Sequence, residues 1–186
     1  MCEDSLGYSL KQTGAKRSVT KKALQKKVLN RVKSTAEWSN FEILTDVPNV
    51  EKMSEVILNF AEPLIEEAGD DDKAYKMAVT LAILVWNVSL MPKDEQDALL
   101  HVELKEASGL SAEDHAASLL VAEMLLKRKQ KHFKGINRLI VDYEIRCTKK
   151  NRHLYVASTS QLPTIGGRLP SPVGKKPWWK RILWWT

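Results

Sequence analysis

The chain has 186 residues, 44% hydrophobic and 28% charged, which is the composition of an ordinary globular protein. This length suits one domain, or one domain with tails, and the composition excludes collagen-like, disulfide-rich and wholly disordered classes. Two cysteines, Cys2 and Cys147, form no disulfide framework and match no zinc-ligand spacing. The first ten residues also lack the apolar run of a secretory signal, so we expect a cytoplasmic protein. We expect no metal or other cofactor.

The net charge of +6 conceals a strong segregation of charge along the chain. Residues 1–34 carry nine Lys and Arg against two Asp and Glu, and residues 127–186 carry fifteen against two. The middle, residues 35–126, carries five against nineteen. Such asymmetry indicates basic ends that meet a polyanion or a membrane surface. Alternatively, the ends lie against the acidic middle and neutralise it.

Residues 1–17 are polar and contain two glycines, so we expect a flexible segment. Residues 18–34 predict a basic amphipathic helix with a narrow apolar stripe at Leu24, Val28 and Val32. A stripe this narrow allows only light docking and leaves a strongly basic surface, which carries Lys22, Lys26 and Arg31.

Residues 36–160 predict a helical domain. Asn49 is expected to cap an amphipathic helix that is kinked or divided at Pro63 and ends at Gly69. The acidic run Asp70–Asp72 then favours a helix start, and the nearly apolar helix that follows extends to about residue 91. A membrane span needs about 20 apolar residues, so this shorter segment is interpreted as a buried central helix.

Two further helices are expected before the pattern changes. The first extends from about Pro92 to residue 108, and the second begins at a capping-box-like Ser111–Asp114 and stops before Gly135. From about residue 137 to 158 the apolar period falls to two, which predicts a β-hairpin. A lone hairpin is marginal in water, so its apolar face is expected to pack on the helices. The alternating apolar residues of this hairpin are Leu139, Val141, Tyr143, Ile145 and Cys147.

The predicted fold class is therefore mainly α (α+β). We expect a compact four- to five-helix bundle around a buried central helix, with one C-terminal β-hairpin and flexible basic tails.

No linear motif points to catalysis. The sequence lacks a phosphate-cradling glycine loop, a nucleophile elbow, a paired-histidine zinc motif and a calcium loop. The carboxylates of Glu62, Glu66 and Glu67 are interpreted as a solvated face, and the four histidines are scattered. We therefore name no catalytic residue, although an enzyme remains open because catalytic residues need not form a linear motif.

Residues 161–186 combine a Pro/Gly-rich linker with a basic tail that holds four of the six tryptophans. Three interpretations compete. The rings could stack on unpaired bases while the cations meet phosphates. They could lie at a lipid headgroup boundary, or dock into an apolar groove of a partner protein or of the chain's own domain.

The sequence thus favours a non-catalytic intracellular binding or adaptor protein that engages nucleic acid through its basic arms. The alternatives are a protein-interaction module and a peripheral membrane protein, with a membrane surface ranked last and no transmembrane segment expected. The candidate contact residues are Lys22, Lys26, Arg31, Lys175, Lys176, Trp178, Trp179, Lys180, Arg181, Trp184 and Trp185.

Overall fold

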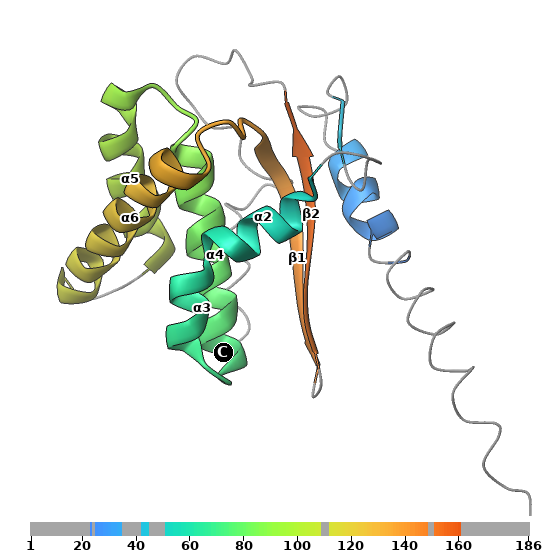
Figure 1. The fold of residues 1–186 in the computed structure, drawn as a ribbon, viewed down its shortest axis with the longest axis horizontal. Coiled ribbons are helices and arrows are strands. Elements are labelled where there is room, and N and C mark those ends of the chain that lie inside the picture. The colour runs from blue at the N-terminus through green and yellow to red at the C-terminus, as the bar shows by residue number, and fades with distance from the viewer. Residues whose placement is uncertain are drawn as a thin grey trace, which may run out of the picture.

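A computed structural model describes residues 23, 25–34, 42–44, 51–108, 112–148 and 151–160. The expectations for residues 1–17, Lys22, Asn49 and residues 161–186 lie outside these ranges. Within them the protein is mostly helical, with six helices and one two-stranded antiparallel hairpin (Figure 1). A helix over residues 25–33 is followed by α2 (Met53–Phe60), α3 (Glu62–Ala68), α4 (Asp72–Val88), α5 (Lys93–Ser108), α6 (Ala112–His132), β1 (Leu139–Thr148) and β2 (Asn151–Thr159).

The predicted division at Pro63 is present, because α2 and α3 are separate helices joined at Ala61. Pro63 has no N–H, so the carbonyl of Asn59 lacks the donor that a continuous helix would supply. Arg128 of α6 takes that place: its Nη2 donates to the Asn59 carbonyl at 3.0 Å and to Glu62 Oε2 at 2.9 Å. The helix break thereby becomes an attachment point for α6.

The apolar helix α4 is the buried element that the sequence predicts. Gly69 ends α3 with a φ of 53°, and Asp71 caps α4 by accepting from the Lys73 N–H at 2.7 Å. Along its length α4 contacts α2, α3, α5, α6 and β1. Among the described residues, no helix combines the length and apolarity that crossing a membrane requires.

Three aromatic rings form the centre of the core beside α4. Trp86 lies edge-on to Phe60 at 5.3 Å and to Phe133 at 6.0 Å between ring centroids, and its Nε1 donates to the Arg138 carbonyl at 2.9 Å. The ammonium of Lys129 lies 4.4 Å from the centre of the Trp86 ring. Trp86 therefore joins α2, α4, α6 and the start of β1.

Lys129, in the basic last turns of α6, is a buried cation. Its ammonium donates to the carbonyls of Phe133 and Ile136, at 2.9 Å each, and so satisfies backbone acceptors just after α6. Burial lowers the pKa of Lys129 below its ordinary value. The run after Leu126 is thus only partly available as a charged surface.

A β-bulge in β1 changes the expected alternation of the hairpin. Ile140 pairs with Ser158 and Asp142 with Ala157, so Val141 is the extra residue between them. Strict alternation predicts that Leu139, Val141 and Tyr143 share one face. The bulge instead puts Leu139 and Val141 on one face and Tyr143 on the other. The side chains of β1 that pack against the helical core are Ile140, Tyr143, Ile145 and Cys147.

The opposite face of the hairpin is covered by the helix over residues 25–33 (Figure 1). Val28 and Val32 are fully buried there against Leu139, Val141 and Ala157. The narrow stripe at spacing four therefore docks this helix on the folded body more closely than the sequence suggests. The hairpin lies between this helix on one side and α2 and α4 on the other.

Replacing a core ring tests the importance of the aromatic cluster. Phe60→Ala removes the ring that touches both Trp86 and Phe133, and we expect it to lower the free energy of unfolding by about 3–5 kcal/mol. Met77→Ala, an exposed apolar position on α4, serves as the matched control and should change stability by less than about 0.5 kcal/mol. Urea unfolding followed by circular dichroism measures both, and equal losses would contradict the assignment.

Candidate nucleic-acid interface

The side of the hairpin that faces away from α4 is called here the outer face. It carries Asp142, Glu144 and Arg146 from β1, with His153 and Tyr155 from β2. The helix over residues 25–33 covers the half of this face nearest Leu139. The other half, toward the hairpin turn, leaves Arg146 and His153 exposed.

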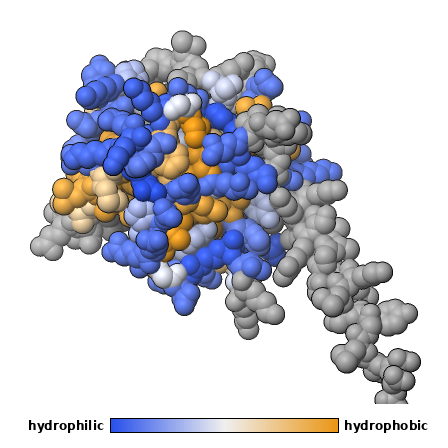
Figure 2. Space-filling view, viewed as in Figure 1, coloured by the Kyte–Doolittle hydropathy of each residue, from blue (hydrophilic) through white to orange (hydrophobic). Residues whose placement is uncertain are grey.

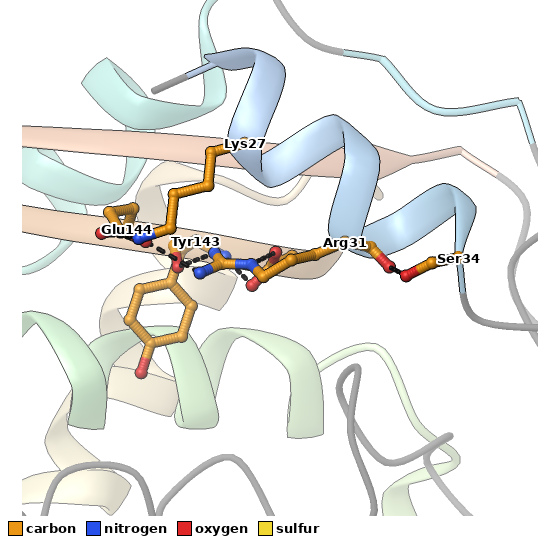
Figure 3. A network of polar contacts seen from close by, with 6 residues as sticks. Lys27, Arg31, Ser34, Tyr143 and Glu144 are labelled. Atoms are coloured by element: carbon orange, nitrogen blue, oxygen red, sulfur yellow. Dashed lines mark hydrogen bonds and ion pairs between the residues drawn. The ribbon is translucent and has the colours of Figure 1, made fainter. Parts of the chain in front are cut away.

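A polar clamp joins the covering helix to the outer face (Figure 3). Arg31 donates to Asp142 Oδ2 and Glu144 Oε2, each at 2.8 Å, and to the Tyr143 carbonyl at 3.1 Å. Lys27 donates to Glu144 Oε1 at 3.2 Å. The Tyr143 ring lies on the other side of the strand, where its hydroxyl is 3.2 Å from Thr80 Oγ1 of α4.

The charges of this clamp stabilise one another. Burial disfavours the charged guanidinium of Arg31, but the carboxylates of Asp142 and Glu144 outweigh burial and raise its pKa above the ordinary value. Burial alone would likewise raise the pKa of Glu144, whereas hydrogen bonds and charge from Lys27 and Arg31 lower it below 4.5. Both acidic side chains of the outer face are therefore neutralised by neighbouring cations.

The part of the outer face toward the hairpin turn is basic and aromatic: Arg146 and His153 are exposed there, while Tyr155 is half-buried and packs against the cluster beneath the covering helix. Arg146 pairs directly with His153 across the two strands. The His153 ring lies 6.4 Å from the Tyr155 ring, measured between centroids. Exposed Lys26 precedes Lys27 in the same turn of the covering helix. Cations and ring surfaces thus occur together on a single two-stranded ribbon.

The turn end of the ribbon is held against the helices. Arg152 lies on the inner side, where its Nε donates to Asp72 Oδ1 at 2.9 Å and its Nη1 to the Gly69 carbonyl at 2.6 Å. Its guanidinium also stacks 4.7 Å from the centre of the Tyr75 ring. Burial, with the charge of Asp72, raises the pKa of the neighbouring Cys147 thiol, which therefore stays protonated and weakly nucleophilic. These contacts fix the geometry of the outer face.

The structure separates the candidate residues named from sequence. Arg31 is engaged in the clamp, with 18% of its side chain exposed, so it is not a freely exposed cation as the sequence suggests. Lys26 is exposed on the covering helix, while Lys22 and the tail residues from Lys175 to Trp185 lie outside the described residues.

Sequence reasoning did not single out Arg146, His153 and Tyr155. The sequence does hold a signal for two of them. Because side chains alternate between the faces of a strand, Arg146 lies on the other face from Ile145, and His153 on the other face from Leu154. The partner across the strands depends on the register, which a single sequence does not show.

Other polar clusters are small. His101 of α5 and His115 of α6 have ring centroids 5.7 Å apart. Among the side chains that the structure describes, no group of three or more His, Cys, Asp or Glu is arranged to hold a metal ion. Comparison with protein-family models, curated proteins and solved structures gives no match to this chain.

Removing the central cation of the clamp should destabilise the protein. Arg31→Met removes the cation that pairs with Asp142, whose side chain is 6% exposed, and we expect the free energy of unfolding to fall by about 3 kcal/mol. Lys33→Met, an exposed position on the same helix, is the control and should cost less than about 0.5 kcal/mol. Similar urea midpoints for the two variants would show that the clamp does not stabilise the fold.

Acid should weaken the same clamp. Because the pKa of Glu144 is lowered in the folded protein, its stabilising contribution is fully present above 4.5 and is lost as pH falls through the folded value. The urea midpoint of the unmodified protein should therefore exceed that of Glu144→Gln at neutral pH, and this advantage should shrink toward about pH 3. An advantage that stays constant over this range would contradict the assigned pKa direction.

Proposed function

We propose that this protein is a non-catalytic nucleic-acid-binding protein and that the uncovered outer face of its hairpin contacts a single strand. The observation that supports this most is the exposed pair Arg146 and His153 on one anchored ribbon, with the half-buried ring of Tyr155 next to His153. The cations would neutralise phosphates, and the rings would stack on unpaired bases.

The neutralised carboxylates also support the proposal. Free carboxylates at Asp142 and Glu144 would repel a phosphate backbone that follows the ribbon. Arg31 and Lys27 already balance them, so the local field near Arg146 is set by the remaining cations. Lys27 also keeps 58% of its side chain exposed and adds to that field.

A single strand fits this face better than a duplex does. Stacking requires unpaired bases, and every base offers a ring surface, so binding of this kind tolerates sequence and depends strongly on salt. The basic tail, with Lys180 and Arg181 between tryptophan pairs, would extend the same footprint.

Membrane attachment receives less support from the described residues. Their exposed large apolar side chains are Met77, Val102, Leu120 and Met124, on α4, α5 and α6, and none of these lies on the outer face. A lipid surface needs apolar side chains next to its cations.

Fluorescence anisotropy with labelled single-stranded RNA and DNA tests the proposal on the full chain. Arg146→Ala should weaken binding equally across sequences and reduce the slope of log affinity against log salt by about 1. Tyr155→Leu keeps apolar packing but removes the ring, and should cost about 1–3 kcal/mol of binding free energy. Lys93→Ala, a charge-matched change at an exposed position on α5, should leave binding unchanged.

The tail is tested by a separate variant in the same assay. Lys180→Ala with Arg181→Ala should also lower affinity without regard to sequence. Absence of binding at low salt, or equal losses in Arg146→Ala and Lys93→Ala, would overturn the proposed role of the outer face. Loss only in the tail variant would assign nucleic-acid binding to the tail alone.

A further inference from the structure

Helices α5 and α6 expose large aliphatic side chains, whereas the outer face of the hairpin is basic and aromatic. On α6, Leu120 is 69% and Met124 is 43% exposed, and exposed Ala117 precedes them at helical spacing, so the three share one face. Val102 of α5 is 53% exposed. Figure 2 shows apolar residues gathered over the N-terminal half of α6, at the left of the view. These residues are called the α5–α6 surface below.

The chain around this surface is acidic. Residues 93–126 carry eight Asp and Glu against two Lys and Arg. The end of α6 adds four cations, of which Lys127 pairs with Glu123, Arg128 pairs with Glu62 and Lys129 is buried, so of these described residues Lys131 is the one left without such a role. An apolar stripe in an acidic setting suits a partner that combines large apolar rings with positive charge.

One segment of the chain itself has that composition. Residues 161–186 carry five Lys and Arg and no Asp or Glu, and their last nine residues hold four tryptophans. We propose that residues 178–185 of this chain dock on the α5–α6 surface. The indole rings cover Leu120 and Met124, while Lys180 and Arg181 meet the surrounding carboxylates.

The connecting segment is long enough for this contact. Residues 161–177 can span up to about 56 Å when extended. A compact body of this size is about 40 Å across, so the tail can reach α6 from Ser160 by any route. Because closing a loop of this length costs little more than closing a shorter one, the tether raises the effective concentration of the tail at the surface.

This docking goes beyond the proposed function and needs no nucleic acid. Where both contacts exist, a nucleic acid competes with the α5–α6 surface for the tail. The acidic body then acts as an internal mimic of the polyanion.

Tryptophan fluorescence of the full chain, without nucleic acid, tests the docking. A blank variant with Phe in place of Trp178, Trp179, Trp184 and Trp185 is subtracted, which removes the emission of Trp38 and Trp86. The remaining tail emission should be blue-shifted and poorly quenched by acrylamide. Leu120→Gln with Met124→Gln keeps helix propensity and should shift the tail emission to the red and increase its quenching.

Met77→Gln, an exposed apolar position on α4, is the matched control and should leave the tail emission unchanged. Far-UV circular dichroism checks that both variants keep the fold. Identical tail emission in the Leu120/Met124 variant and the unmodified chain would overturn the proposal. So would a blue shift that disappears on dilution, since this would indicate docking on a second copy of the chain. The result is independent of the anisotropy assay, so the two proposals can fail separately.

Discussion

A two-stranded sheet is marginal in water, and the fold depends on covering both faces of this one. The extra residue at Val141 makes that possible. Without the bulge, alternation from Leu139 would direct Asp142, Glu144 and Arg146 into the apolar core beside α4. With it, Tyr143 and Ile145 enter the core, and the carboxylates lie under Arg31. The single extra residue thus avoids the burial of unpaired charge. It also places Asp142 and Glu144 where they bind Arg31 of the helix over residues 25–33.

Several Arg and Lys side chains of this chain donate hydrogen bonds that hold the fold together. Arg128 compensates the carbonyl freed by Pro63, Lys129 satisfies the carbonyls after α6, and Arg152 ties the hairpin turn to α3 and α4. Arg138 donates to the Glu51 carbonyl and to Ser158 Oγ, and burial lowers its pKa. Net charge along the sequence therefore overstates the basic surface. The cations left exposed near the outer face are a small set, which confines the proposed interface to one part of the molecule.

The elements predicted from sequence are those whose boundaries depend on local chemistry. Pro63 divides its helix, Gly69 and the adjoining aspartates mark the passage from α3 to α4, and the change of period near residue 137 marks the hairpin. The features that sequence did not show depend on distant partners. Arg31 meets Asp142 across 111 positions, and Arg128 meets the Asn59 carbonyl across 69. Periodicity predicts that a residue lies on a polar face, but it does not show which cations form ion pairs or hydrogen bonds within the fold.

The segregation of charge along the sequence links the two proposed surfaces. In the two proposals, the uncovered outer face would repel the basic tail through its cations, whereas the acidic residues near the α5–α6 surface would attract it. A polyanion on the outer face reverses that balance, because it offers the tail a second acidic partner close to Arg146. Added salt screens both attractions and leaves the apolar contacts of the indole rings. If the tail docks as proposed, the tryptophans would hold it in place at high ionic strength, and the charges would set how readily it exchanges between the two surfaces at low ionic strength.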